Sequence, residues 1–217
     1  MEKAQIIKAV CDALSQGEAE AATGILEASY PYAPGTVTKR RVRPVDWIRV
    51  FVRDGFIDRY DGARLVFPPV LRMVSHALPA RFPYHPHWRT RSTHPAYWEV
   101  SATIDHVIPV TRGGTDEPSN WVTTSMAHNS AKMNCTLGEL GWQLQKRGDV
   151  REWDGLLAWC VEYSAQHPGA IVDRALRRWL HAGSLVWAET QSTGGQATPS
   201  NKRLQPAAPG EIIRRRG

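Results

Sequence analysis

Apolar residues recur at helical spacing in several separate stretches of this chain. In residues 2–14, for example, Ile6, Val10 and Leu14 stand four positions apart, which places them on one face of a helix. Proline and glycine residues separate such stretches, because neither favours the interior of a helix. The pattern predicts helices over residues 2–14, 18–28, 44–54, 69–78, 136–146, 153–166 and 171–189.

Short alternating stretches between these helices predict β-strands. Residues 56–60 and 63–67 flank Asp61-Gly62, a dipeptide typical of a tight hairpin turn. Residues 103–109 also alternate, and residues 120–122 form a second short strand-like stretch. We therefore expect a β-hairpin near residue 60 and a second pair of short strands further along the chain.

The second pair of strands is predicted to lead directly into a helix. Gly113 and Gly114 lie in the turn-rich loop between the strands, and Thr124 or Ser125 can cap a helix that runs to Lys132. The whole pattern indicates an α+β fold, with small antiparallel β elements embedded in a mostly helical scaffold.

Five segments follow from this organisation. They are an N-terminal helical segment (1–35), a basic segment with the hairpin and a loop rich in histidine and aromatic residues (36–95), a strand–loop–strand–helix core (96–135), C-terminal helices (136–190) and a basic tail (191–217). The tail is rich in Ser, Thr, Gly, Gln and Pro, so we expect it to be disordered.

Positive charge exceeds negative charge, with 27 Lys and Arg against 21 Asp and Glu residues and a formal net charge of +6. Basic side chains displace counterions from phosphates, so this balance favours a polyanionic partner such as nucleic acid. The cluster Lys39, Arg40, Arg41 and Arg43, together with Arg112, could contact phosphates. A solvated face or linker is the alternative interpretation of the cluster.

The cysteines and the hydropathy favour a cytoplasmic protein. Cys11, Cys135 and Cys160 lie far apart and form no Cys-x-x-Cys pair, which argues against a disulfide framework and fits a reducing compartment. No stretch approaches the roughly 20 apolar residues that cross a bilayer. We expect no membrane partner.

Residues 82–98 form a long loop-like stretch rich in His, Pro and aromatic residues. A connection of this length indicates either a function or packing through its own side chains. His85, His87 and His94 could bind zinc, but no cysteine accompanies them and prolines interrupt their spacing. Packed or phosphate-contacting histidines are the preferred interpretation.

The stretch from Trp98 to Lys132 carries the residues suited to catalysis. Asp105 and His106 stand near the end of the predicted strand 103–109, where their side chains leave opposite faces unless the strand bends or ends there. A histidine can act as a general base at neutral pH, and carboxylate and amide oxygens are ligands for a hard cation.

This stretch resembles the HNH (ββα-metal) nuclease family. The family pattern is Asp or His followed by His, then Asn about fourteen residues on, then His or Asn about nine residues later, and Asp105-His106, Asn120 and Asn129 match that register. Gly113-Gly114 in the loop and Lys132 match as well. The variant with Asn in the last position is similar to the HNH domain of RNA-guided CRISPR effector nucleases. The resemblance covers about 35 residues.

The resemblance implies a Mg²⁺-dependent endonuclease that hydrolyses DNA phosphodiester bonds, with Mn²⁺ able to substitute. In this interpretation His106 is the general base and the amide oxygen of Asn120 holds its imidazole ring. Asp105 and Asn129 bind the ion through oxygen.

Two residues of the predicted helix are further candidates for the site. His128 could be another metal ligand or a phosphate contact, although a neighbour on a helix points roughly 100° away from Asn129. Lys132 lies three residues from Asn129 on the same helix face and could hold a phosphate.

Several consequences of the resemblance concern zinc, partners and substrate. Many relatives bind a structural zinc with two Cys-x-x-Cys pairs, but Ser125 and His128 stand where one pair would be, so we do not expect that zinc.

One HNH site cuts one strand, so a double-strand break would need a homodimer or two encounters, and a partner protein could control cleavage. The alternatives are an RNA-cleaving HNH nuclease and a catalytically silent nucleic-acid-binding protein. We expect a role in prokaryotic defence or restriction.

Overall fold

The structure is a computed structural model that describes residues 2–32 and 43–193. The chain divides into two compact units. The N-terminal unit contains helices α1 (Lys3–Ser15) and α2 (Ala19–Ser29), whose buried residues pack together in a small core of their own. Both N-terminal helices predicted from the sequence are confirmed.

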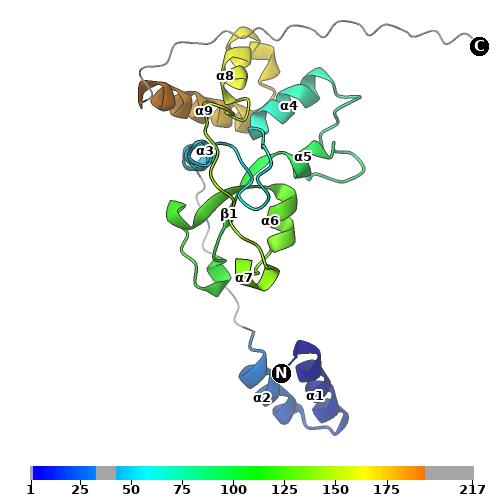
Figure 1. The fold of residues 1–217 in the computed structure, drawn as a ribbon. Helices are drawn as coiled ribbons and strands as arrows, with labels where there is room; N and C mark the ends of the chain where they lie inside the picture. Colours follow the sequence, from blue (N-terminus) through cyan, green and yellow to red (C-terminus); the bar gives the residue numbers. More distant parts are fainter. Residues whose placement is uncertain (1, 33–42, 194–217) are drawn as a thin grey trace, which may run out of the picture. The chain divides into compact units, whose positions relative to one another are not determined.

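The main unit begins at Arg43 and contains the sheet and the remaining helices (Figure 1). Helices α3, α4 and α9 confirm three of the sequence predictions to within a few residues. The helical elements of this unit outside the strand region have the following bounds: α3 (Pro44–Arg53), α4 (Pro68–Ala77), α5 (Ala96–Glu99), α8 (Leu157–Gln166), the 3₁₀ turn η3 (Pro168–Ala170) and α9 (Arg174–Thr193).

Aromatic side chains form the centre of the main core. Phe51, Phe56 and Phe67 are fully buried, with ring centroids of successive pairs 5.6 and 6.4 Å apart. Leu157 of α8 and Leu180 of α9 belong to the same core. Each such side chain contributes about 1.5–3 kcal/mol through burial. The core therefore joins the helices to the segment that carries Phe56 and Phe67.

The described residues contain one two-stranded sheet. Strand β1 (Ala102–His106) pairs antiparallel with β2 (Trp121–Ser125), and its last residue, His106, lies opposite Trp121. The two 3₁₀ turns η1 (Val110–Arg112) and η2 (Pro118–Asn120) lie in the connecting loop. This small sheet among many helices confirms the α+β class.

Helix α6 (Met126–Lys132) follows β2 without a linker. The hydroxyl of Ser125 accepts the backbone N–H of His128 at 3.2 Å and so caps the helix. The predicted succession of strand, loop, strand and capped helix is therefore present. However, β1 ends at His106, three residues before the predicted end at residue 109, and β2 runs over Trp121–Ser125 where 120–122 was predicted.

The hairpin predicted over residues 56–67 forms only in part. One isolated antiparallel bridge joins Ile57 and Arg64, and the backbone N–H groups of Asp58 and Leu65 donate to the carbonyls of Ala63 and Phe56 at 2.8 Å. Part of this segment bonds to the sheet instead. The backbone N–H of Arg59 donates to the carbonyl of Thr123 in β2 at 2.9 Å. This contact with β2 engages a backbone group of the predicted hairpin, so the local pattern did not extend into a full pair of strands.

The helix predicted over residues 136–146 is also wrong in its extent. The capping box of Thr136 and Glu139 starts α7 (Leu137–Leu140), but Gly141 ends it in the left-handed region at φ +66°. The chain then runs beside residues 54–59, where the Gln145 N–H donates to the Arg59 carbonyl at 2.8 Å. Helix α8 likewise begins at Leu157, four residues after the predicted start at Trp153.

A buried carboxylate fastens α3 to the sheet. Asp54 is fully buried, and its Oδ2 accepts the backbone N–H of Thr123 at 2.9 Å. Nitrogens of Arg53, Arg59 and Arg147 lie 2.9, 3.2 and 3.2 Å from its Oδ1. These cations and the amide offset the cost of burying the charge, so Asp54 can hold β2 against α3.

Some predictions fall beyond the described residues. Lys39, Arg40 and Arg41 lie there, as do residues 194–217 of the expected tail. The start of that tail at residue 191 is wrong, because α9 continues to Thr193. Among the described residues, no helix has the length and apolar character needed to span a membrane.

Gly155 offers a test of the packing around Phe56. Its φ is +65°, and a Cβ at this position would lie 2.2 Å from the Phe56 ring. We expect Gly155→Ala to lower the free energy of unfolding by about 2–4 kcal/mol, because left-handed backbone and overpacking both cost energy. Gly169→Ala is the matched control, since nothing lies within 4 Å of its Cβ position. Urea denaturation giving equal losses for both variants would contradict this packing.

Candidate functional site

The end of β1 and one face of α6 meet at the site predicted from the sequence. The amide nitrogen of Asn129 donates to the carbonyl of Ile104 at 3.1 Å, and the ammonium of Lys132 donates to the carbonyl of His106 at 2.7 Å. Asn129 and Lys132 are three residues apart and share a helix face. The structure thus brings α6 against the strand residues that flank Asp105.

The carboxylate of Asp105, a residue that is 7% exposed, contacts three polar groups of the protein. Its Oδ2 accepts the hydroxyl of Tyr60 at 2.6 Å and lies 3.0 Å from the ammonium of Lys132. Its Oδ1 accepts the backbone N–H of His106 at 2.7 Å. Burial, reinforced by the hydrogen bond to Asp105, raises the pKa of the Tyr60 phenol, so Tyr60 remains a donor.

Lys132 is fully buried, and the prediction that it contacts a phosphate is wrong. A side chain with no exposed surface cannot reach a substrate. Its ammonium instead neutralises the buried carboxylate of Asp105 and binds the carbonyl of His106. Lys132 is therefore a structural counter-ion of the site.

The imidazole of His106 is held through one of its two nitrogens. Nε2 lies 2.7 Å from Oδ1 of Asp116 and 3.0 Å from the indole nitrogen of Trp121, which is itself 3.2 Å from Asp116. If Nε2 carries the proton, both the imidazole and the indole donate to the same carboxylate oxygen. Within the described residues Nδ1 of His106 has no hydrogen-bond partner, so this arrangement leaves its lone pair open.

The prediction that Asn120 holds the imidazole of His106 is wrong. Its amide oxygen accepts the N–H of Ile108 at 3.0 Å, and its amide nitrogen donates to the carbonyls of Ile108 and Thr115 at 2.8 and 2.9 Å. Asn120 therefore clamps the loop between β1 and β2. It acts on His106 only through the shape of that loop, which also carries Asp116.

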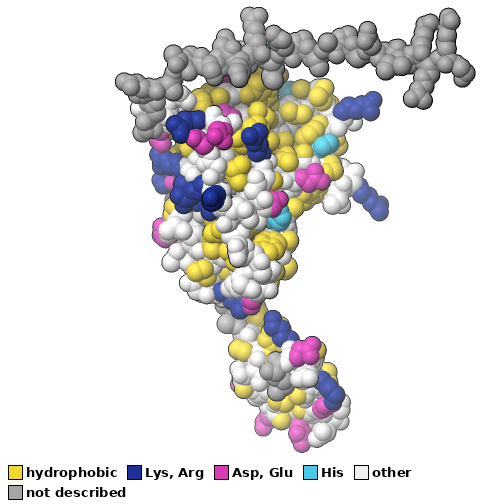
Figure 2. Space-filling view, in the orientation of Figure 1, with side chains coloured by type: hydrophobic (Ala, Val, Ile, Leu, Met, Phe, Trp, Pro, Cys, Tyr) yellow, Lys and Arg dark blue, Asp and Glu magenta, His cyan; other side chains and the backbone are white. Residues whose placement is uncertain are grey.

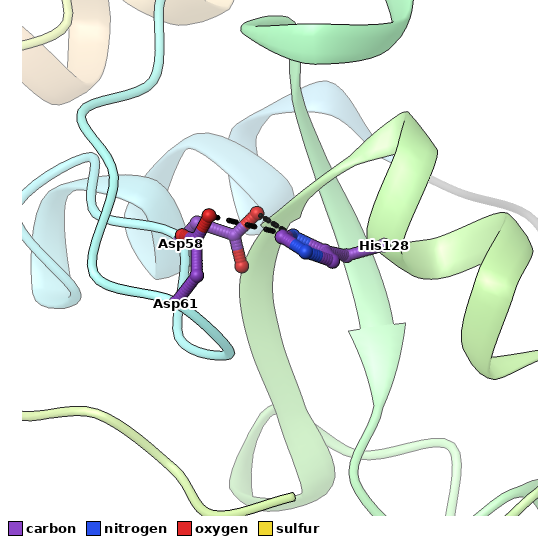
Figure 3. Close-up of side chains that lie close together, drawn as sticks. All are labelled: Asp58, Asp61 and His128. Carbon is purple, nitrogen blue, oxygen red and sulfur yellow. Dashed lines mark hydrogen bonds and ion pairs between the residues drawn. The ribbon is translucent and has the colours of Figure 1, made fainter. Parts of the chain in front are cut away.

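His128 turns away from Asn129, as their adjacent positions on α6 require. Its Nδ1 lies 2.8 Å from Oδ2 of the buried Asp58 and 4.0 Å from Oδ2 of the exposed Asp61 (Figure 3). The expected role of His128 as a further ligand of an ion held by Asp105 and Asn129 is therefore not supported. His128 belongs to a separate group of side chains.

The group of Asp58, Asp61 and His128 could hold a metal ion, because one ligand atom from each lies within 4.8 Å of the others. Asp58 also accepts hydrogen bonds from the backbone N–H of Ser125 at 2.8 Å and the hydroxyl of Thr124 at 3.0 Å. An ion would have to share this carboxylate with those donors. The same contacts tie Asp58 to the junction of β2 and α6.

Asp105 and Asn129 offer oxygen atoms that fit a hard cation. Oδ1 of Asp105 accepts one hydrogen bond, so it retains a lone pair, whereas Oδ2 is occupied by Tyr60 and Lys132. The amide oxygen of Asn129 accepts no hydrogen bond among the described residues, and the residue is half-buried. Carboxylate and amide oxygens are ligands of the kind that Mg²⁺ uses together with waters.

The loop over residues 82–98 packs through its own side chains, which confirms one of the two expectations for it. The ring of His94 stacks on Phe82 with centroids 4.0 Å apart, and its Nδ1 accepts the Ala96 N–H at 3.2 Å. His85 accepts the backbone N–H of His87 at 3.1 Å. These three histidines are part of no metal-capable group found among the described residues.

The basic residues expected to contact nucleic acid have different surroundings. The exposed guanidinium of Arg43 pairs with Asp46 at 2.7 Å, which fixes it at the start of α3. Arg112 is exposed on η1. Nothing in the structure tests whether either residue contacts a phosphate, so both remain predictions.

Three residues of the site were missed from the sequence, namely Tyr60, Asp58 and Asp116. Tyr60 and Asp58 come from a segment that the sequence pattern assigned to a hairpin, about 45 positions before β1. Asp116 lies ten residues after His106 in a polar loop, beside Glu117. No local signal separates Asp116 from its acidic neighbour, because only the folded loop brings it to the imidazole.

Comparisons of the chain with models of protein families, with curated proteins and with solved structures found no match.

The buried pair of Asp105 and Lys132 can be tested by unfolding. Lys132→Met leaves Asp105 buried without its counter-ion, so we expect the free energy of unfolding to fall by about 3–5 kcal/mol. Asp105→Asn combined with Lys132→Met removes both charges and should recover at least about 1 kcal/mol of that loss. Urea denaturation of the single and double variants measures this coupling. Strictly additive losses would show that the two charges do not stabilise one another.

Proposed function

We propose that this protein is a metal-dependent endonuclease of the HNH type that hydrolyses phosphodiester bonds in DNA. The observation that carries the proposal is the imidazole of His106 at the end of β1, whose Nε2 binds Asp116 while Nδ1 has no hydrogen-bond partner among the described residues. Hydrolysis of a phosphodiester needs a base for water, relief of phosphate charge and help for the leaving oxygen. The side chains around this strand end supply groups suited to these tasks.

His106 takes the proton from the attacking water in this mechanism. Asp116 holds the Nε2 proton, so Nδ1 is the basic nitrogen of the neutral ring. When Nδ1 gains a proton, the imidazolium faces the Asp116 carboxylate at 2.7 Å, and this contact stabilises the new charge. Trp121 donates its indole N–H to the same carboxylate oxygen, and its nitrogen lies 3.0 Å from Nε2, which limits rotation of the ring. Asp116 and Trp121 are thus positioning residues.

Asp105 and Asn129 would hold a Mg²⁺ ion through Oδ1 of the carboxylate and the amide oxygen. When bound, the ion supplies Lewis-acid stabilisation of phosphate and leaving-group charge. Lys132 and Tyr60 keep the Asp105 carboxylate in place from its other oxygen. This division leaves Oδ1 for the ion and Oδ2 for the protein.

The charge of the surface favours a nucleic-acid substrate. Figure 2 shows Lys and Arg side chains gathered on one flank of the main unit, near α3 and α9. Arg174, Arg177 and Arg178 of α9 are exposed and make no ion pair with the rest of the described chain. Unpaired arginines on a surface can contact phosphates without regard to sequence. A role in prokaryotic defence or restriction is the setting that we propose for such a nuclease.

The assignment of His106 can be tested by cleavage of supercoiled plasmid with Mg²⁺. We expect His106→Ala to reduce nicking by about 100-fold or more, the usual contribution of a general base. His76→Ala is the matched control, because His76 is an exposed histidine on α4, away from this site. Undiminished nicking by His106→Ala would remove the base from the mechanism.

Parallel assays on single-stranded DNA and on RNA decide the substrate. Faster cleavage of RNA than of either DNA would replace the DNA assignment with the RNA-cleaving alternative. Binding without cleavage in any divalent ion would instead support a catalytically silent nucleic-acid-binding protein.

The proposed ligand pair predicts a change in the metal dependence of nicking. Asn129→Ala removes one oxygen ligand, so the Mg²⁺ concentration for half-maximal nicking should rise by about tenfold or more. Asn134→Ala replaces an exposed asparagine just beyond α6 and should retain the wild-type dependence. An identical Mg²⁺ dependence in Asn129→Ala would exclude Asn129 as a ligand.

A further inference from the structure

A second feature of the main unit is a cavity whose lining includes four aromatic residues. Tyr84, Trp88 and Tyr97 come from residues 84–97, and Trp179 comes from α9. The cavity has a volume of about 160 Å³ and is partly open to solvent. A cavity of about 150 Å³ is large enough for a benzene ring. The dimensions and the lining therefore suit one flat aromatic group.

A buried hydroxyl faces into this cavity. Ser101 is only 2% exposed and lines the cavity, yet its side chain forms no hydrogen bond among the described residues. Among the described residues, Oγ1 of Thr93 is the only side-chain polar atom that is both inaccessible and without a hydrogen-bond partner, so the Ser101 hydroxyl is not inaccessible. The Ser101 hydroxyl is therefore reached from the cavity, where it can donate or accept one hydrogen bond.

Arg72 adds a cation to the wall of the cavity. Its guanidinium lies 3.8 Å from the centroid of the Tyr84 ring, and one of its nitrogens binds Asp173 at 2.6 Å. The planar guanidinium carries five N–H donors, so this ion pair leaves others for a ligand. Aromatic walls with a hydroxyl and a guanidinium match a ring that has polar edges.

Two arginines of α9 border the cavity on its outer side. Ala175, Leu176 and Trp179 of this helix line the cavity, and Arg174 and Arg178 are exposed one position away from lining residues. Helix geometry places Arg174 and Arg178 one turn apart, beside the lining face. A ligand with a flat ring and an attached phosphate could place its ring in the cavity and its phosphate near these two arginines.

We propose that this cavity binds one unpaired nucleobase of the DNA, stacked on the aromatic lining while Ser101 and Arg72 bind its edge. This inference rests on the proposed function, because a nuclease places DNA next to the cavity. A base displaced from the helix or already unpaired fits such a pocket, and unpaired bases cost the least to insert. The preferred substrate is then DNA with an unpaired base near the cut.

Strand β1 sets the distance between this cavity and the proposed chemistry. Ser101 directly precedes β1 and His106 ends it, so five residue steps separate them. At about 3.3 Å per residue this corresponds to roughly 17 Å. One strand of duplex DNA advances about 3.4 Å per nucleotide. The bound base should therefore lie about five nucleotides from the bond that is cut.

Binding can be measured without cleavage by using 2-aminopurine, a fluorescent base that stacking quenches. The probes are DNA duplexes with one unpaired or one paired 2-aminopurine, titrated with full-length protein in EDTA. We expect saturable quenching of the unpaired probe alone. Trp88→Ala should weaken binding by about tenfold, in line with the loss of one stacking contact. Ser101→Ala tests the hydroxyl with little effect on packing.

Trp159→Ala is the matched control, because Trp159 is 40% exposed on α8, stacks on Tyr163 and does not line the cavity. It should bind the probe as the wild type does. No quenching by the wild type, or equal binding by Trp88→Ala, Ser101→Ala and the control, would overturn the proposal. Binding of a proline-rich peptide in place of the probe would assign the cavity to a protein partner and would also overturn it.

A second arm with Mg²⁺ maps the cut on the same duplexes by gel electrophoresis. Cleavage about five nucleotides from the unpaired base supports the proposed geometry, and cleavage at positions unrelated to that base contradicts it. Specific quenching without cleavage by the wild type would support the base pocket and would reject the nuclease assignment. The two proposals can thus fail separately.

Discussion

The ion pair between Asp105 and Lys132 determines how the strand and the helix of the site fit together. A fully buried ammonium needs partners, and Lys132 finds them in the Asp105 carboxylate and the His106 carbonyl. A one-residue slip of β1 would turn Asp105 to the opposite face and leave Lys132 without its counter-ion. The pair therefore fixes the register of β1 and, through α6, the position of Asn129. His106 then projects from the other face of the strand end, where Asp116 and Trp121 hold it.

Two further buried carboxylates explain how so small a sheet is held in place. An isolated pair of short strands is at best marginally stable in water. Asp54 binds the backbone of Thr123, and Asp58 binds the backbone of Ser125, so successive inward residues of β2 are tied to the segment that follows α3. Phe56, between the two carboxylates, is anchored in the aromatic core. The site thus depends on the helical core for its rigidity, although it contributes few apolar residues to that core.

Strand β1 connects two regions with different chemistry. At its end lie the imidazole and the oxygen atoms proposed to hold a metal ion, and before its first residue lies the aromatic cavity that Ser101 lines. A rigid strand between them would keep a catalytic group and a base-binding pocket at a constant separation. The group of Asp58, Asp61 and His128 forms a third, distinct cluster at the junction of β2 and α6, and its main observed role is to bind that junction together.

Local patterns in the sequence were sufficient for the helices α1, α2, α3, α4 and α9 and for the succession of β1, β2 and α6. Those features depend on periodicity, caps and breakers, which act over a few residues. The tertiary structure alone decided that Asp58 and Arg59 bond to β2, that Lys132 is buried, that Asn120 clamps the loop and that Asp116 holds His106. Each of these outcomes depends on a hydrogen bond or ion pair of a polar group whose partner is brought near only by folding. Such partners produce no periodic pattern in the sequence.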